Sequence, residues 1–450
     1  MNKKEGFTSK IGFVMAAAGS AVGLGNLWRF PYLAARYGGG TFLLVYLILA
    51  VTFGFALMMT EIAIGRKTGK SALSAFSVLN KKYTFVGYLA CVVPCIIFPY
   101  YCVIGGWVTK YLATYLIGQG KAAAGDNYFT GFIALAGEPI IWLLVFMLAT
   151  MLVVIMGVQK GIEKASKIMM PVLVVLSVII AIYSVTRDGA MAGVVYYFKP
   201  DFSKFSVNLV FAALGQLFYS MSLAMGIMIT YGSYMGKKDD LESSVHQIEF
   251  FDTLIAFIAG LIIIPAVFAF SGGDQSVLNS GPSLMFITLP KVFDSMGMGT
   301  VIGVTFFLLV LFAALTSAIS LMETIVSFIE EKTTWGRTKA SIIVAIVSML
   351  IAIPSALGFS IWSHIQVWGL SILDFFDFLS NSVIMPIVAF FTCVFAGYII
   401  KPKAIVDEVE SSSKFKNKKL YTVMIKYIAP IFIIMIFFSS ILKGLGIIDF

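Results

Sequence analysis

The sequence predicts an all-α membrane protein with eleven transmembrane helices, and three observations support this fold class. Of the 450 residues, 59% are hydrophobic and only 12% are charged, whereas a soluble domain has about 25% charged residues. The mean hydropathy is +0.95. Apolar runs of about 20 residues, the length needed to cross a bilayer, recur along the whole chain. An ordinary soluble enzyme is therefore excluded.

Each predicted helix is an apolar run bounded by polar or charged residues, long enough to cross the bilayer at a rise of about 1.5 Å per residue. We expect the runs to form a single transmembrane domain over residues 1–450. In order, the eleven runs are residues 11–35, 41–65, 84–117, 139–157, 167–185, 206–235, 245–270, 300–329, 340–357, 371–400 and 424–446.

The net charge of +9 does not indicate a nucleic-acid partner, because Lys and Arg form short clusters between apolar runs and no continuous basic face. With the N-terminus in the cytoplasm, clusters such as Lys81 and Lys82 or Lys237 and Lys238 fall in cytoplasmic loops. This is the distribution that the positive-inside rule expects. An odd number of helices then places the C-terminus outside.

The residue types that support most enzyme chemistry are scarce. The four cysteines lie within apolar runs, and there are only two histidines, so neither a disulfide framework nor a histidine-based metal site is expected. No nucleophile–base pair, metal triad or cofactor loop is found in the sequence. We therefore do not expect an enzyme.

The first and sixth runs contain residues that interrupt helices. Glycine weakens a helix by about 1 kcal/mol relative to alanine, and an opened backbone within lipid must find internal partners. The interrupting residues are Gly19, Gly23, Gly25 and Pro31 in the first run and Gly215, Ser220, Ser222 and Gly226 in the sixth. Close helix packing through small residues is one explanation. The other is that the two runs open two blocks of five helices, where interrupted helices indicate a transporter's binding site.

Several motifs carry a family resemblance. Residues 21–31 read Ala-Val-Gly-Leu-Gly-Asn-Leu-Trp-Arg-Phe-Pro and are followed by three glycines at 38–40. The later motifs are Gly215-Gln216, Ser222-Leu-Ala-Met-Gly226, Thr230-Tyr-Gly-Ser-Tyr234, Leu315-Thr-Ser317 and Leu373-Asp-Phe-Phe-Asp377. In this order and spacing they resemble the neurotransmitter:sodium symporter family. The resemblance implies a LeuT-type fold: a 5+5 inverted repeat over about 11–185 and 206–400, broken helices 1 and 6, and an additional helix at about 424–446.

The resemblance also implies a function. It implies sodium-coupled uptake of an amino acid by alternating access, across the cytoplasmic (inner) membrane of a bacterium. The expected partners are the amino-acid substrate and the lipid bilayer. Two sodium ions are expected and no organic cofactor, and the oligomeric state is not predicted. The alternative is a channel or a substrate-sensing receptor on the same scaffold.

The resemblance assigns a substrate pocket. Its residues would be Ala21, Leu24, Gly25, Ile97, Tyr101, Tyr219, Ser220, Ser222, Met225, Ser317 and Leu321. Met225 lies between Ala224 and Gly226, where a flexible thioether can move aside for a bulky side chain. We therefore expect a hydrophobic substrate, aromatic or large aliphatic. The simpler alternative is that Met225 only fills the core.

Sodium needs a shell of oxygen ligands, which an unwound helix can supply through its carbonyl groups. By resemblance, one site would use Ala21, Asn26, Ser220 and Asp252, and the other Gly19, Val22, Ala313, Thr316 and Ser317. The hydroxyl groups of Thr316 and Ser317 could instead bond to their own helix. A permanent negative charge at Asp252 would make transport independent of chloride, unless Asp252 is only an interfacial residue near a helix start.

Charged residues near the ends of the helices are candidates for gates. By resemblance, Arg29 and Asp377 would close the outer path, with Asp374 as a competing partner for Arg29. Lys4 and Glu331 would close the inner path, although each also fits a solvated helix end.

Two tyrosines and two glutamates complete the set of candidates. By resemblance, Tyr101 and Tyr219 form an aromatic lid over the substrate, although an aromatic residue in a membrane helix more often packs against its neighbours. We expect Glu61 to brace the unwound backbone. Glu323 has no assignable role.

Overall fold

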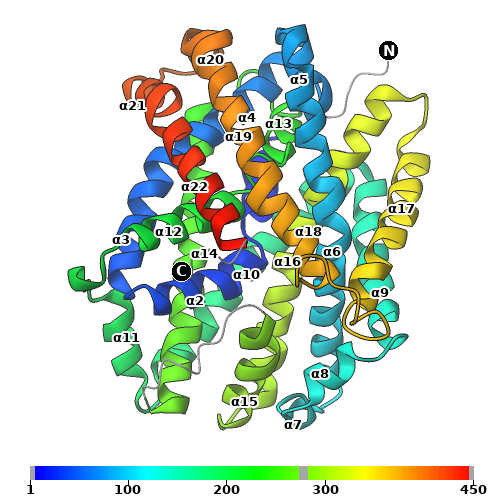
Figure 1. Cartoon of the computed structure of the whole chain (residues 1–450), viewed down its shortest axis with the longest axis vertical. Coiled ribbons are helices and arrows are strands. Elements are labelled where there is room, and N and C mark those ends of the chain that lie inside the picture. The colour runs from blue at the N-terminus through cyan, green and yellow to red at the C-terminus, as the bar shows by residue number, and fades with distance from the viewer. Residues whose placement is uncertain (1–5, 273–281, 445–450) are drawn as a thin grey trace.

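The computed structural model describes residues 6–272 and 282–444, and these residues form a bundle of helices (Figure 1). Among them no strand is formed, and two isolated bridges, Gly39 with Pro200 and Val367 with Leu370, are the extent of β pairing. The prediction of an all-α protein is confirmed.

The bounds of the elements are as follows. The first half contains α1 (Lys10–Ala21), α2 (Phe30–Arg36), α3 (Gly40–Leu49), α4 (Phe55–Thr68), α5 (Ala72–Leu79), α6 (Thr84–Leu116), α7 (Gly120–Ala123), α8 (Tyr128–Ile133), α9 (Glu138–Ile155), α10 (Lys164–Val185) and α11 (Ala190–Phe198). The second half contains α12 (Val207–Ser220), α13 (Ile227–Gly232), α14 (Leu241–Ser271), α15 (Leu289–Asp294), α16 (Gly299–Lys332), α17 (Arg337–Leu357), α18 (Ile372–Asp377), α19 (Met385–Val394), α20 (Lys401–Glu410), α21 (Lys418–Val423) and α22 (Ala429–Gly444). Wider π-helical turns are η1 (Gly25–Arg29), η2 (Ala50–Gly54), η4 (Val158–Glu163), η7 (Leu284–Thr288), η8 (Phe378–Ile384), η9 (Phe395–Ile399) and η10 (Met424–Ile428), and 3₁₀ turns are η3 (Lys81–Tyr83) and η5 (Phe202–Lys204).

The predicted membrane spans correspond to helices of suitable length and composition. In the described residues nine helices are long and apolar enough to cross a membrane, and a tenth span arises if the bent pair Lys10–Ala21 and Gly25–Arg36 is taken as one. The predicted span 206–235 corresponds to the shorter apolar helix α12 followed by α13. The count of eleven therefore stays a prediction, because in the described residues ten of the predicted runs at most, with the bent pair counted as one, are long and apolar enough to cross a membrane.

Both predicted interruptions are confirmed. The first span bends by 54° between Ala21 and Gly25. The sixth stops at Ser220 and resumes at Ile227. Residues 221–226 between these helices include Ser222, Ala224 and Gly226 at positive φ of 53°, 60° and 72°.

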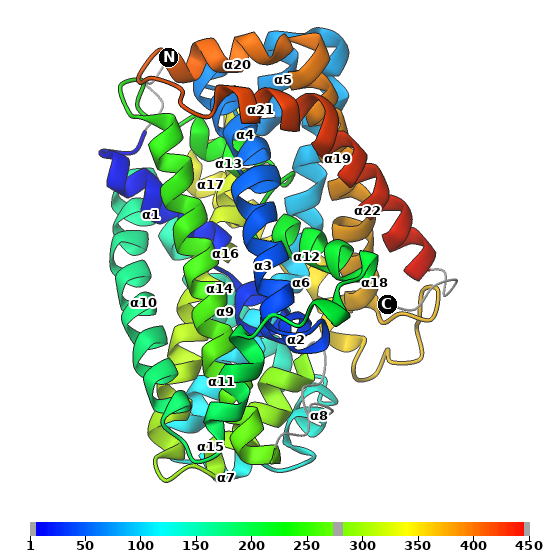
Figure 2. The same cartoon turned by 90° about the vertical axis from the view of Figure 1, so that its left-hand side faces the viewer.

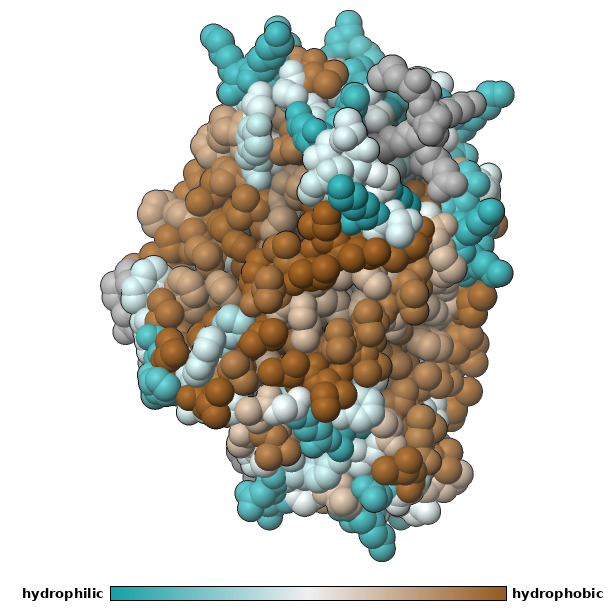
Figure 3. Space-filling model, turned by 90° about the vertical axis from the view of Figure 1, so that its right-hand side faces the viewer, coloured by the Kyte–Doolittle hydropathy of each residue, from teal (hydrophilic) through white to brown (hydrophobic). Residues whose placement is uncertain are grey.

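On the face shown in Figure 3 an apolar belt crosses the middle of the molecule, with hydrophilic residues at both ends. Burial separates central helices from peripheral ones. In the most apolar window of Lys81–Leu116, which contains α6, 78% of residues are buried, whereas for Lys418–Leu442, which contains α22, only 22% are. Apolar side chains that are exposed in this belt suit contact with lipid chains.

The two ends of the bundle are built differently. Helices α5, α20 and α21 lie at one end, here called the α20 end, and α7, α8 and α15 lie at the other, the α15 end (Figures 1 and 2). At the α20 end the buried guanidinium of Arg66 forms an ion pair with Glu408 (2.9 Å) and donates to the carbonyl of Asp239 (2.8 Å). The ammonium of Lys237 also reaches Glu408 (3.0 Å). These contacts hold α20 against the end of α4 and the loop before α14.

Candidate functional site

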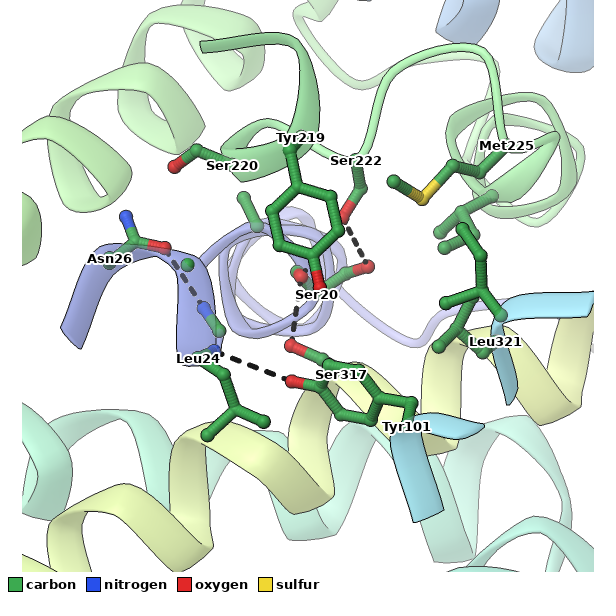
Figure 4. A pocket seen from close by; sticks show the side chains of 15 residues that line it. Ser20, Leu24, Asn26, Tyr101, Tyr219, Ser220, Ser222, Met225, Ser317 and Leu321 are labelled. Carbon is green, nitrogen blue, oxygen red and sulfur yellow. Dashed lines mark hydrogen bonds between the residues drawn. The ribbon is translucent and has the colours of Figure 1, made fainter. Parts of the chain in front are cut away.

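The two interruptions face each other in the middle of the bundle and form a pocket (Figure 4). Glycine is required in the first break, because a Cβ on Gly23 would lie 2.8 Å from Ser317 Oγ, and one on Gly25 would lie 2.7 Å from the ring of Tyr219. Asn26 closes the turn by accepting a hydrogen bond from the Gly23 N–H (3.1 Å). The close approach of four helices at this point leaves no room for larger residues.

In this conformation the cavity volume is about 30 Å³, well below the usual range for ligand pockets of about 300–1,000 Å³, so the lining side chains nearly fill the site. Its lining residues are Ser20, Ala21, Gly23, Leu24, Gly25, Asn26, Ile97, Tyr101, Tyr219, Ser220, Ser222, Met225, Ile227, Ser317 and Leu321. All eleven residues of the predicted substrate pocket are in this set. Their part in binding substrate stays a prediction.

One side of the pocket is polar and the other apolar. The Leu24 N–H donates to the hydroxyl oxygen of Tyr101 (3.4 Å), and the hydroxyl of Ser222 donates to the carbonyl of Ser20 (3.0 Å). Figure 4 shows Met225 and Leu321 on the side away from Asn26 and Leu24. The polar backbone and hydroxyl groups at the breaks suit the charged ends of a zwitterion, and the apolar side suits a hydrocarbon side chain.

A buried carboxylate lies beside the polar side of the pocket. Asp252 in α14 is fully buried, and its Oδ1 accepts hydrogen bonds from Asn26 Nδ2 (2.8 Å) and Ser220 Oγ (2.7 Å). Its Oδ2 accepts from the hydroxyl of Tyr46 (3.3 Å). Three residues of the first predicted sodium site, Asn26, Ser220 and Asp252, are thus in direct contact, and Ala21 lines the same pocket. Asp252 is a deeply buried residue of the bundle and not an interfacial one.

The second predicted sodium site lies where α1 and α16 meet. Ser317 Oγ donates to the carbonyl of Ser20 (3.1 Å) and lies 3.5 Å from the carbonyls of Gly19 and Val22. Thr316 Oγ1 bonds within its own helix, to Phe312 O (2.9 Å) and to the carbonyl of Ala313 (3.1 Å). The structure brings all five predicted residues together. Thr316 shows the own-helix bonding of the simpler alternative, and Ser317 does not.

A second pocket lies next to the first on its α15 side, and Tyr219 lines both. Its cavity volume is about 310 Å³, and its walls include Arg29, Asp374 and Asp377. Asp377 accepts hydrogen bonds from the hydroxyl of Tyr100 (3.1 Å) and from Asn381 Nδ2 (2.7 Å).

The predicted outer gate is therefore assembled but not paired. Arg29 and Asp377 face the same pocket, yet within the described chain they form no ion pair at 4.0 Å or less. The competing partner Asp374 is engaged by Ser371, whose hydroxyl lies 2.7 Å from its Oδ2. A closing pair of Arg29 and Asp377, direct or through water, stays a prediction.

At the α20 end the N-terminal segment is held in place. The Phe7 N–H donates to the carbonyl of Tyr234 (3.0 Å), the Thr8 N–H to Glu163 Oε2 (2.8 Å), and Gln159 Nε2 to the carbonyl of Gly6 (2.8 Å). These bonds hold the start of the chain over the α20 side of the first break.

The predicted inner gate is only partly described. Lys4 lies outside the described residues. Glu331 accepts a hydrogen bond from the Ser71 N–H (2.8 Å) and lies 3.8 Å from the ammonium of Lys70. A pairing of Lys4 with Glu331 stays a prediction.

The structure shows which groups contact two buried glutamates, Glu61 and Glu323. Glu61 Oε1 accepts a hydrogen bond from the Ala224 N–H (2.7 Å), which is in the second break, and so braces the unwound backbone as expected. Glu323, for which the sequence suggested no role, forms an ion pair with Arg337 and accepts from the hydroxyl of Tyr234 (2.7 Å).

Sequence reasoning missed three contributors to the site. The hydroxyl of Tyr46 donates a hydrogen bond to Asp252. The carbonyl of Ser20 accepts hydrogen bonds from the hydroxyls of both Ser222 and Ser317. Gln216 Nε2 donates to the carbonyl of Gly25 (3.0 Å). Gln216 had a usable signal, since it belongs to a motif shared with the family. No sequence signal pointed to Tyr46, because an aromatic residue in an apolar span normally packs against its neighbours.

The family is decided by comparison with known proteins. The model of the family described as "Sodium:neurotransmitter symporter family" matches residues 4–122 and 128–446. The chain belongs to this family. It is a transporter and not an enzyme, as expected from the sequence.

Individual relatives agree with this assignment. The transporter is 35% identical over 451 residues to the uncharacterized sodium-dependent transporter YhdH of Bacillus subtilis, covering 99% of this chain and 98% of that protein. It is 26% identical over 500 residues to the human sodium- and chloride-dependent taurine transporter, covering 98% of this chain and 78% of that protein. Among solved structures it resembles MhsT in complex with L-phenylalanine, with a TM-score of 0.88, 38% identity, and coverage of 97% of this chain and 100% of that one. The predicted LeuT-type fold is confirmed.

Proposed function

We propose that this transporter couples the inward flow of sodium to the uptake of a hydrophobic amino acid by alternating access. The observation that carries the proposal is the pocket at the two helix breaks, which joins polar backbone and hydroxyl groups to an apolar wall containing Ile97, Met225 and Leu321. An amino acid with an apolar side chain matches this pocket, because its zwitterionic end suits the polar side and its side chain suits the apolar side. The similar structure of MhsT with bound L-phenylalanine supports an aromatic or large aliphatic substrate.

Two sodium ions would bind beside this pocket. The first would lie near Asn26, Ser220 and Asp252, and the second near Ser317 and the carbonyls at the end of α1. Hydroxyl, carbonyl and carboxylate oxygens are the ligands that hard cations prefer. No organic cofactor has a role in this scheme.

Chloride independence follows from the buried carboxylate. An ionised side chain in a membrane interior is costly unless it is paired, and a sodium ion next to Asp252 would favour its charged form. Asp252 would then supply the negative charge that a bound chloride would otherwise provide.

The driving force is sufficient for strong accumulation. A tenfold sodium gradient contributes about 1.4 kcal/mol per ion, and a membrane potential of about 100 mV contributes roughly 2.3 kcal/mol more. Two ions therefore provide about 7 kcal/mol, which corresponds to roughly 10⁵-fold accumulation of a neutral substrate.

The orientation of the chain follows from its loops. Lys81, Lys82, Lys237 and Lys238 all lie in loops that precede or follow helices at the α20 end. The positive-inside rule then places this end in the cytoplasm and the α15 end outside, in the cytoplasmic membrane of a bacterium. An N-terminus in the cytoplasm and a C-terminus outside complete this arrangement.

The gates would act in alternation. Arg29 and Asp377 would close the pocket that faces the α15 end, with Tyr219 as the ring between the two pockets. At the α20 end the docked segment around Phe7 and Thr8 would have to leave before the substrate could reach the cytoplasm.

The deciding experiment is uptake of labelled phenylalanine or leucine into proteoliposomes that contain the purified protein. We expect uptake against a concentration gradient when sodium is outside, and equal uptake when chloride is replaced by gluconate. Substrate flux that only follows its own gradient would instead indicate a channel. Binding of substrate without any flux would indicate a receptor on the same scaffold.

A further inference from the structure

A hollow at the α20 end lies outside the transport pathway. It is formed by the first turns of α14 and by the loop 411–417 between α20 and α21, and its cavity volume is about 360 Å³. Its walls include Ser243, His246, Lys414, Lys416 and Asn417. Figure 2 shows α14 on the face toward the viewer, beside α3, with the chain from α20 to α21 at the top.

The acidic residues of this hollow are already occupied in holding the loop. Glu242 accepts hydrogen bonds from the backbone N–H groups of Lys416 (2.8 Å) and Asn417 (2.9 Å). Asp240 Oδ1 accepts from Ser413 Oγ (2.9 Å). The loop is thus pinned to the start of α14, and its lysines are brought to the rim of the hollow.

The positive charges of the hollow remain available. Lys414 and Lys416 are exposed, and in the described structure neither forms an ion pair within 4.0 Å. Lys10 adds a third ammonium close by, since its Nζ donates to Ser243 Oγ (2.7 Å). Asp240 interacts electrostatically with Lys10 and Lys416, but Asp240 and Glu242 direct their hydrogen bonds to backbone and hydroxyl groups. An anion in the hollow would therefore meet the ammonium groups of Lys414 and Lys416 without having to displace a direct ion-pair partner.

An apolar groove continues from the hollow along the membrane face. It lies between α14 and the chain from α3 to η2, has a cavity volume of about 340 Å³, and shares His246 and Phe250 with the hollow. Its other walls include Leu47, Val51 and Phe257. From residue 246 to residue 257 the helix rises by about 16 Å, which matches half of a hydrocarbon core of about 30 Å.

His246 links the polar groups at the junction of hollow and groove, while Glu249 Oε1 has no hydrogen-bond partner in the described structure. His246 Nδ1 lies 3.0 Å from Glu249 Oε2, its Nε2 lies 3.1 Å from Asn417 Nδ2, and its ring stacks on Phe55. The carboxyl group on the groove wall therefore has a histidine partner next to the hollow. The groove below this pair is almost entirely apolar.

We propose that the hollow and the groove together bind one anionic phospholipid of the leaflet at the α20 end. The phosphate would lie between Lys414, Lys416 and Asn417, and one acyl chain would follow the groove past Val51 and Phe257. A cluster of lysines directly before a membrane helix is typical of sites for anionic lipids. The site is independent of the substrate pocket, and the proposed orientation places it in the cytoplasmic leaflet.

The test is lipid binding by native mass spectrometry of the purified full chain in neutral detergent. Phosphatidylglycerol, phosphatidylcholine and inorganic phosphate are the three probes. The double variant Lys414→Gln/Lys416→Gln should bind phosphatidylglycerol about 25-fold more weakly, because each lysine near an anionic lipid contributes roughly fivefold. The control Lys418→Gln/Lys419→Gln removes the same charge from the same segment, outside the hollow, and should change binding less than about twofold.

A second variant tests the groove. Val51→Trp fills it at a position that is 47% exposed and leaves every charge in place, so it should also weaken binding of phosphatidylglycerol. A sodium-dependent thermal transition like that of the wild type shows that each variant is folded. Equal losses in the two lysine variants, no effect of Val51→Trp, or binding of phosphatidylcholine or free phosphate as tight as that of phosphatidylglycerol would each overturn the proposal.

Discussion

Replacing Asp252 by asparagine tests the first proposed sodium site, because it removes a negative charge and keeps the shape of the side chain. In the structure the two carboxylate oxygens accept hydrogen bonds from Asn26, Ser220 and Tyr46. An asparagine would present an NH₂ group where one of these oxygens lies. If this group takes the place of Oδ2, the Tyr46 hydroxyl can rotate and accept from it, so the main change is the loss of the negative charge.

The expected loss of sodium affinity follows from Coulomb's law. Two unit charges about 4 Å apart interact by roughly 4 kcal/mol at an effective dielectric constant of about 20. Part of this is offset, because the asparagine variant no longer buries a charge, which costs several kcal/mol per ion in a protein interior. We expect a net weakening of about 1.4 to 2.7 kcal/mol, which corresponds to roughly 10- to 100-fold in the sodium concentration for half-maximal uptake.

The assay is a sodium titration of labelled leucine uptake in proteoliposomes, in chloride and in gluconate. The matched control is Tyr46→Phe, which removes only the 3.3 Å hydrogen bond to Asp252 and keeps the charge. Its cost of about 1 kcal/mol corresponds to roughly fivefold at most. In the Asp252→Ser variant, added chloride should restore part of the activity. An unchanged sodium affinity in Asp252→Asn, or strict chloride dependence of the unmodified protein, would refute the reasoning.

Three other perturbations give separate readouts. Arg29→Ala should lower the uptake rate by roughly tenfold or more, which corresponds to about 1.4 kcal/mol. The control Arg36→Ala, which removes a hydrogen bond to Tyr32, should have little effect on the uptake rate. Equally mild effects of the two substitutions would contradict the outer gate. Arg337→Gln leaves the fully buried Glu323 without its ion-pair partner. It should lower the free energy of unfolding, measured in detergent, by about 3–5 kcal/mol. The double variant Arg337→Gln/Glu323→Gln should recover part of this stability. In competition with labelled tyrosine, aromatic and large aliphatic amino acids should compete best; glycine as the best competitor would contradict the role of Met225.

The helix breaks could be predicted because glycine and small polar residues interrupt two otherwise apolar runs at matching positions. Their exact geometry could not. Gly19 and Gly215 lie inside α1 and α12, outside the breaks themselves. In the second break Ser222 and Ala224 adopt positive φ, a conformation that such residues rarely take. The positive φ at these two positions therefore could not be predicted from the residue types.

The partners of buried polar groups could be predicted only in part. The family motifs placed Asn26 and Ser220 beside Asp252, but Tyr46 reaches it across 206 residues of sequence. An acid such as Glu323 within a membrane helix indicates that a partner exists. Identifying that partner as Arg337 requires the packing of two helices, which hydropathy does not encode.

The contrast between the two ends of the bundle has a kinetic consequence. Toward the α15 end a single ring, that of Tyr219, forms the wall shared by the two pockets, so opening this wall requires the movement of only one side chain. Toward the α20 end the backbone at Gly6, Phe7 and Thr8 makes three hydrogen bonds to two separate parts of the chain, η4 and the loop after α13. Freeing such a segment is a collective motion of microseconds to milliseconds or longer. We therefore expect loading from the α15 side to equilibrate quickly, and the turnover rate to be governed by how often the N-terminal segment undocks.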